Sequence, residues 1–230
     1  MTGKDENGLT RRDFIKTASA ASMAALVAGV SGSGGRCASG SDTIRVGVIG
    51  CGGRGTGAAI DAVNSSPGVE IAALYDPFQD RVDGCLKRLR ETVPAAVKVT
   101  PETCFTGLDG YKALLAIKTI NYIVTAAPPG FRPLHLDAAV RAGKNVFMEK
   151  PVAVDPVGVR SVIASSELAA KKGLAIVAGT QRRHQRSYIE LMKRVRDGAI
   201  GELVGGQCYW NQGDLWVIER TPGMSDMEWQ

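Results

Sequence analysis

The sequence predicts an α/β fold in which a doubly wound parallel sheet of the Rossmann type is covered by helices. Two observations predict it: short apolar runs rich in β-branched residues alternate with amphipathic stretches, and a glycine-rich turn follows the first run. Continuous apolar runs are typical of buried parallel strands, and the alternation implies right-handed crossover helices. A hydrophobic fraction of 44% and a charged fraction of 22% suit an ordinary globular protein.

The first strand is expected at residues 44–49, and a helix is expected at residues 56–64. Between them, residues 50–55 read GCGGRG, which matches the pattern G-x-G-x-x-G. This pattern, placed after a strand and before a helix, is typical of a turn that binds a dinucleotide.

Each glycine of that pattern has a physical role. Gly50 permits the tight turn, Gly52 lets the backbone approach a pyrophosphate, and Gly55 lets the helix pack closely on the strand. The helix N-terminus offers free N–H groups to phosphates. Arg54 lies in the turn and is a candidate for a direct phosphate contact.

A second strand is expected at residues 69–75, and Asp76 follows it. Asp76 stands near the sequence spacing at which an acid hydrogen-bonds the adenosine ribose. An acid there repels a 2′-phosphate, so NAD is favoured over NADP. Because Arg81 lies close by in the sequence, NADP is the less favoured alternative. The alternative role for Asp76 is a helix N-cap before Pro77, which is compatible with the first.

The remaining elements continue the alternation. Helices are expected at residues 79–92, 111–116, 133–142, 156–172 and 187–197, and strands at 97–99, 120–126, 145–148, 174–178 and 203–210. Gly143 and Gly173 stand where glycine commonly ends a helix. Ligands of such sheets bind at the carboxyl ends of the strands. The clusters expected to meet at that edge are residues 50–55, 76, 127–130, 149–151 and 181–184.

Three segments carry a family resemblance. Residues 142–151 read AGKNVFMEKP, residues 127–135 read APPGFRPLH, and residues 181–183 read QRR. They resemble the A-G-K-H-V-x-x-E-K-P, T-P-x-x-x-H and N-x-R segments of the Gfo/Idh/MocA oxidoreductases, the family of glucose-fructose oxidoreductase and inositol dehydrogenase. The resemblance covers residues 44 to about 210. It implies NAD or NADP as cofactor and hydride transfer to or from a sugar or cyclitol.

The resemblance also implies roles for single residues. Lys150 of the E-K-P segment is the implied catalytic residue, which hydrogen-bonds the reacting oxygen. Glu149 is implied to orient Lys150 or to contact the nicotinamide ribose. The other implied cofactor contacts are Ala127, Pro128, Lys150 itself, Pro151, Gln181 and Arg183. The structural alternatives are a lysine before a turn proline for Lys150 and a surface acid for Glu149.

A substrate domain is implied after the Rossmann domain of residues 42–178. In the family this domain is a large antiparallel sheet that supplies an Asp and a His one helical turn apart. It is expected to begin within residues 179–230 with the strand at 203–210. His135 and His184 lie in no such motif, so the chain is expected to be truncated. On its own it is expected to bind the cofactor but to turn over no sugar. A homo-oligomer is expected to need the complete sheet. A shortened homologue that only binds nucleotide is the alternative.

Residues 1–41 are expected to be a twin-arginine signal peptide and linker. Residues 10–16 read TRRDFIK and resemble the twin-arginine motif. The apolar run at 18–30 is too short to cross a bilayer core of about 30 Å, but it suits the h-region of a signal peptide. We therefore expect a periplasmic or other extracytoplasmic protein that keeps its cofactor bound and meets the membrane only through the export machinery. A disordered basic N-terminus is the alternative.

Charge and cysteine usage argue against two other classes. The formal net charge of +5 rests on 28 basic and 23 acidic residues. Residues 1–41 hold five of the basic and three of the acidic residues. Residues 42–230 therefore have 23 basic and 20 acidic residues, a net charge of +3. No Lys/Arg run is interleaved with aromatics, so no nucleic-acid partner is expected. The five cysteines match no metal-site spacing, so no metal is expected. We expect the cysteines to be buried free thiols instead.

These observations favour an NAD-dependent oxidoreductase that acts on a sugar, polyol or cyclitol with a tightly bound cofactor. One alternative is a glycoside hydrolase that oxidises its substrate transiently with retained NAD, and it would release free sugar without net redox change. The other alternative is a non-catalytic nucleotide-binding module.

Overall fold

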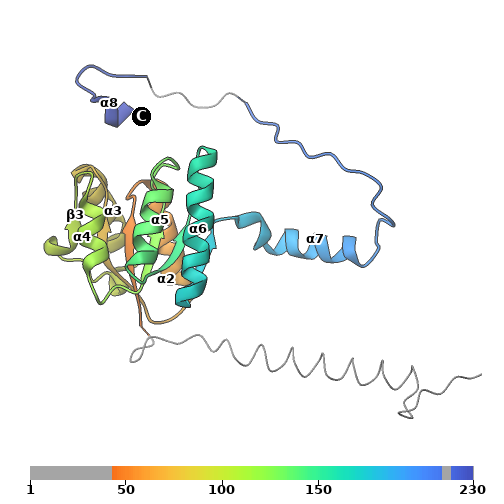
Figure 1. Ribbon diagram of the computed structural model, residues 1–230, viewed down its shortest axis with the longest axis horizontal. Coiled ribbons are helices and arrows are strands. Elements are labelled where there is room, and N and C mark those ends of the chain that lie inside the picture. Colours follow the sequence, from red (N-terminus) through yellow and green to blue (C-terminus); the bar gives the residue numbers. More distant parts are fainter. Residues whose placement is uncertain (1–42, 214–218, 230) are drawn as a thin grey trace, which may run out of the picture. The chain divides into compact units, whose positions relative to one another are not determined.

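The computed structural model describes residues 43–213 and 219–229. The described residues divide into two compact units, residues 43–180 and residues 181–213 with 219–229. The first contains a six-stranded sheet with the strand order β3-β2-β1-β4-β5-β6, and all of its strand pairs are parallel. The strands are β1 (Ile44–Ile49), β2 (Val69–Tyr75), β3 (Cys104–Phe105), β4 (Tyr122–Thr125), β5 (Asn145–Met148) and β6 (Ile176–Ala178). The predicted doubly wound sheet is confirmed (Figure 1).

Five helices cover the two faces of this sheet. They are α2 (Gly53–Ser65), α3 (Gln79–Thr92), α4 (Gly110–Ala116), α5 (Arg132–Arg141) and α6 (Pro156–Lys172). Helices α2 and α3 pack with Val46 and Val48 of β1 in one apolar core. Helices α4, α5 and α6 pack with Ile49 of β1 in the other. Side chains of a strand alternate between its faces, so β1 feeds both cores.

The ends of α6 show the expected helix signals. The Asp155 side chain accepts a hydrogen bond of 2.6 Å from the Gly158 backbone N–H, and Pro156 occupies the first helical position. Gly173 ends the helix in the left-handed conformation, with φ of 68°. Gly143 follows α5 with φ of 73°. Both glycines therefore end helices, as the sequence predicts.

The third strand is not where the sequence predicts it. Residues 97–99 contribute only an isolated bridge between Val97 and Ile71, and β3 pairs with β2 through Cys104 and Phe105 instead. Prolines flank the predicted run, at residues 94 and 101, and each starts a turn of 3₁₀ helix: η1 (Pro94–Ala96) and η2 (Pro101–Thr103). Proline has no N–H to give to a ladder, so the run is too short to form a strand.

The second unit contains η3 (Gln181–Arg183), α7 (Arg186–Arg196) and α8 (Asp226–Trp229). The prediction of a strand at residues 203–210 is wrong, because these residues have no regular structure and Val204 is 96% exposed. A strand needs a neighbour for its N–H and C=O groups. The described part of this unit contains no other strand that could supply one.

No helix in residues 43–213 and 219–229 is long and apolar enough to cross a membrane. The same residues contain no group of three or more His, Cys, Asp or Glu side chains suited to a metal ion. Cys51 and Cys85 are buried free thiols as expected, whereas Cys104 is half-buried and Cys208 is exposed. The predicted signal peptide and Cys37 lie outside the described residues.

Candidate functional site

The glycine-rich turn joins β1 to α2 at the carboxyl edge of the sheet, and two of its glycines are required by packing. Gly50 has φ of +93°, and a Cβ atom there would lie 2.6 Å from the Ala127 nitrogen. A Cβ atom on Gly55 would lie 1.8 Å from the Gly50 carbonyl oxygen. Only glycine fits such positions.

Gly52 has a different environment from the other two glycines. A Cβ atom on Gly52 would meet no atom within 4 Å, so open space faces the turn there. Gly52 is the N-cap of α2, no side chain caps it, and the first turn of the helix holds no acidic residue. The first N–H groups of a helix have no intrahelical partner. Donors of this kind beside open space suit a pyrophosphate, so the turn fits a dinucleotide.

Asp76 lies beside this turn, at the end of β2. One carboxylate oxygen accepts a hydrogen bond of 2.8 Å from the Cys51 N–H, and the other accepts one of 3.1 Å from the Phe78 N–H. The N-cap of α3 is Phe78, with no side-chain cap, so the N-cap alternative for Asp76 is wrong. Asp76 instead ties the turn to β2. Its contact with a ribose stays a prediction.

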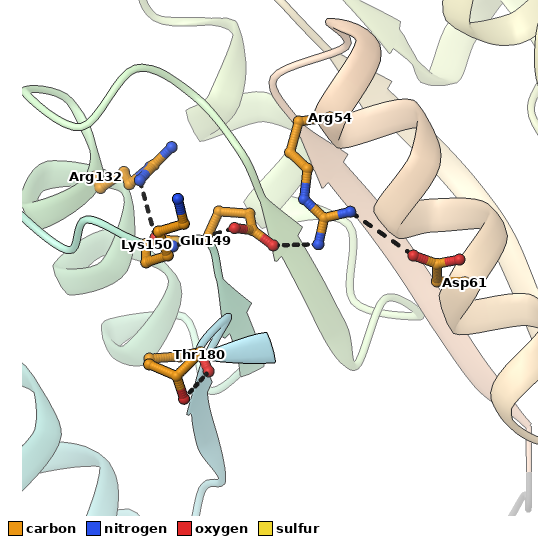
Figure 2. A network of polar contacts seen from close by, with 7 residues as sticks. Arg54, Asp61, Arg132, Glu149, Lys150 and Thr180 are labelled. Atoms are coloured by element: carbon orange, nitrogen blue, oxygen red, sulfur yellow. Dashed lines mark hydrogen bonds and ion pairs between the residues drawn. The ribbon is translucent and has the colours of Figure 1, made fainter. Parts of the chain in front are cut away.

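Glu149 follows β5 and its carboxylate is buried. It forms an ion pair with Arg54 of the glycine-rich turn (Figure 2). The Lys150 backbone N–H donates to the same carboxylate at 3.3 Å. A Cβ atom on Gly179 would lie 2.6 Å from Glu149 Oε1, so this side of the carboxylate is closed by backbone. The surface-acid alternative for Glu149 is therefore wrong, and Arg54 contacts a carboxylate of its own chain.

Arg132 is the buried residue of this site that the sequence did not indicate. Its guanidinium donates to the carbonyl oxygens of Ala127 at 2.7 Å, Glu149 at 3.0 Å and Pro151 at 2.5 Å. Burial lowers the pKa of Arg132, and the Glu149 charge opposes this shift. Arg132 therefore fixes the backbone on both sides of Lys150. The side chain of Lys150 is exposed, and its peptide bond to Pro151 is cis.

His135 of the predicted T-P-x-x-x-H segment lies in the core. Its ring packs against Tyr111, Tyr75 and Phe131, with ring centroids 4.8, 6.1 and 6.4 Å away. Burial lowers the pKa of His135 to about 4. Nδ1 has no hydrogen-bond partner among the described residues. His135 is thus a neutral histidine within the packing of α5 against the sheet.

The other predicted site residues fall in two places. Ala127 and Pro128 follow β4, and Pro151 follows β5, so these three join the same edge as Gly50 and Glu149. Gln181 and Arg183 form η3 of the second unit, with no buried residue among them. Their contact with a cofactor stays a prediction.

Comparison with known proteins gives the family. The model of the oxidoreductase family GFO_IDH_MocA, described as an NAD-binding Rossmann fold, matches residues 44–180. A glycosyl hydrolase family 109 protein of Solibacter usitatus is 30% identical over 228 residues, which are 96% of this chain and 50% of that protein. An inositol 2-dehydrogenase/D-chiro-inositol 3-dehydrogenase of Halalkalibacterium halodurans is 26% identical over 72% of this chain and 44% of that protein.

A solved structure shows the same fold. It is scyllo-inositol dehydrogenase from Lactobacillus casei with bound NAD(H) and scyllo-inositol, at a TM-score of 0.58 and 23% identity. The match covers 70% of this chain and 43% of that one. This chain spans about half the length of the curated relatives it matches. The match of the family model over residues 44–180 shows that the chain belongs to the Gfo/Idh/MocA oxidoreductase family and contains its NAD-binding Rossmann fold.

Proposed function

We propose that the protein transfers hydride between a tightly bound NAD and a sugar or cyclitol. One observation carries this proposal: the glycine-rich turn, Asp76 and the Glu149-Lys150 segment meet at one edge of a sheet that belongs to an NAD-binding family. Matched relatives include an inositol dehydrogenase and a dTDP-3,4-didehydro-2,6-dideoxy-α-D-glucose 3-reductase. Both names describe oxidation or reduction at a ring carbon.

In this proposal the Rossmann edge holds the cofactor. The turn of Gly50, Gly52 and Gly55 and the N-terminus of α2 bind the pyrophosphate. Asp76 hydrogen-bonds the adenosine ribose, and its charge disfavours the 2′-phosphate of NADP. The remaining cofactor contacts within this unit are Arg54, Ala127, Pro128, Glu149, Lys150 and Pro151.

The bound nicotinamide supplies the hydride acceptor or donor. Lys150 would hydrogen-bond the substrate oxygen and stabilise its alkoxide character as hydride leaves the carbon, and the hydroxyl proton would pass to the solvent beside the exposed Lys150. Arg132 keeps the Lys150 backbone in place through its bonds to Glu149 and Pro151. Such positioning matters because a reacting group gains most when its geometry is fixed before the reaction.

Turnover tests this proposal. The protein isolated from its source organism, incubated with NAD and a panel of cyclitols and sugars, should form NADH with at least one of them, and Lys150→Met should abolish the reaction. NAD binding without NADH formation across the panel would contradict the assigned reaction.

The relative from Solibacter usitatus favours a second candidate, a glycoside hydrolase that uses retained NAD. The same assay separates the two. Release of free sugar from an aryl glycoside with no net NADH would support the hydrolase, whereas NADH formation without glycoside cleavage would exclude it. Cofactor binding with neither reaction would indicate a nucleotide-binding module.

We also propose that the protein is exported with its cofactor by the twin-arginine route. The support is the TRRDFIK segment at residues 10–16 and the apolar run that follows it. A folded, cofactor-loaded passenger suits this route, since little free dinucleotide is available outside the cytoplasm.

A further inference from the structure

The ion pair between Arg54 and Glu149 bridges two parts of the sheet edge that are not neighbours. Arg54 lies on the first turn of α2, after β1, and Glu149 follows β5. Strand β4 lies between β1 and β5 in the sheet. The pair therefore spans the end of β4, next to the point between β1 and β4 where the strand order reverses. Figure 2 shows the ion pair itself.

The two charges of this pair lie in different environments. The Glu149 side chain is 5% exposed, whereas the Arg54 side chain is 48% exposed. Gly179 closes one side of the carboxylate, and Arg132 bonds the Glu149 carbonyl oxygen. Within residues 43–213 and 219–229, Arg54 is the cation in direct contact with the carboxylate. A buried carboxylate that loses its partner acts strongly on nearby charges, because little solvent screens it.

The topology places this pair beside the nicotinamide half of a bound dinucleotide. A dinucleotide lies across the point where the strand order reverses, with one mononucleotide half over each half of the sheet. Asp76, after β2, belongs to the adenosine half, so Glu149, after β5, belongs to the nicotinamide half. The nicotinamide ring is positively charged in NAD⁺ and neutral in NADH. A charge at this edge therefore acts on the two forms unequally.

We propose that the Arg54–Glu149 pair sets the ratio at which the site holds oxidised and reduced cofactor, an inference that rests on the proposed NAD site. The Glu149 carboxylate stabilises NAD⁺ relative to NADH, and the Arg54 guanidinium offsets it. Each tenfold change in the affinity ratio shifts the potential of the bound two-electron couple by about 30 mV. Arg54 is thus a residue that tunes the cofactor as well as one that joins two segments.

Calorimetric titration of the full chain with NAD⁺ and with NADH tests this inference through the ratio Kd(NADH)/Kd(NAD⁺). Arg54→Gln should raise the ratio on the order of tenfold, and Glu149→Gln should lower it by a similar factor. The double variant should return close to the wild-type ratio. Arg54→Lys keeps the charge and should stay within about twofold of wild type.

Asp61→Asn is the matched control. Asp61 is the other carboxylate near Arg54, at 3.7 Å, but it is exposed, so loss of its screened charge should leave the ratio unchanged. If the pair had a purely structural role, Arg54→Gln and Glu149→Gln would weaken the binding of NAD⁺ and of NADH equally. An unchanged Kd ratio in these variants would overturn this inference but leave the proposed NAD site standing. Absence of binding to the wild-type chain would overturn the NAD site as well. If circular dichroism shows that Glu149→Gln does not fold, the Kd ratios of Arg54→Gln and Arg54→Lys still test the inference: only Arg54→Gln should raise the ratio.

Discussion

The Arg132 guanidinium donates a hydrogen bond of 2.5 Å to the Pro151 carbonyl oxygen. The same side chain bonds the carbonyl oxygen of Glu149, so it holds the residues on both sides of Lys150. A buried guanidinium with three carbonyl partners cannot be replaced by a group with one point of contact. The position of Lys150 therefore depends on a residue of α5 that is remote from it in the sequence.

Arg132→Lys should destabilise the fold by about 2 kcal/mol, because a lysine leaves part of this carbonyl set unpaired in a buried place. Urea unfolding followed by circular dichroism measures the change. The control is Arg141→Met on the same helix, which removes an exposed ion pair with Asp137 and should cost less than about 0.5 kcal/mol. Equal effects of the two substitutions would contradict the role given to Arg132.

His135 should make stability depend on pH. Burial lowers its pKa to about 4 in the folded protein, below its ordinary value of 6.5. Between these two pKa values the unfolded chain binds more protons than the folded protein. The contribution of His135 to the free energy of unfolding is therefore complete above pH 6.5 and is lost as the pH falls toward 4. The loss should approach about 3 kcal/mol. His135→Phe should flatten this part of the stability profile in urea titrations, whereas the exposed His184→Gln should keep the wild-type slope.

The two kinds of glycine in the turn should respond differently to alanine. Gly55→Ala places a Cβ atom 1.8 Å from the Gly50 carbonyl oxygen and should destabilise the protein by at least about 2 kcal/mol. Gly52→Ala meets no protein atom within 4 Å, so thermal unfolding should be nearly unchanged. Its methyl group should nevertheless hinder the pyrophosphate and weaken NAD binding about tenfold or more. Unchanged NAD affinity of Gly52→Ala would contradict the proposed use of this turn.

Export should depend on the guanidinium groups of Arg11 and Arg12. Replacement of both by lysine keeps the charge but loses the planar donor fork, so precursor should accumulate in the cytoplasm. Cell fractionation and immunoblotting measure the distribution. Arg36→Lys, a substitution outside the TRRDFIK segment, is the control and should leave export unchanged. Normal export of the Arg11/Arg12 double variant would contradict the proposed route.

Local signals predict most of the sheet. The strand-turn-helix of residues 44–65 follows from apolar β-branched residues and glycine spacing, which depend on near neighbours in sequence. The prediction of a strand at 203–210 is wrong because the residue pattern of this segment carries no information about a pairing partner. The third strand is displaced because prolines at 94 and 101 flank the run at 97–99. In both cases the outcome depends on pairing across the sheet.

The candidate site is predicted less completely. Gly50, Gly55, Asp76 and Glu149 stand at the expected edge, because strand ends and glycine turns place them. Arg132 and the Arg54–Glu149 contact carry no sequence signal. Each depends on residues far apart in the chain that meet only when the strands take the order β1-β4-β5.

The central claim is that the edge formed by the glycine-rich turn and Asp76 binds NAD, and calorimetric titration of the wild-type chain with NAD and NADP tests it most directly. Asp76 should make NAD bind at least about tenfold more tightly than NADP, because a carboxylate at the ribose repels a 2′-phosphate. Asp76→Asn should narrow this difference. Equal affinity of the folded wild-type chain for the two nucleotides, or binding to neither, would contradict the account.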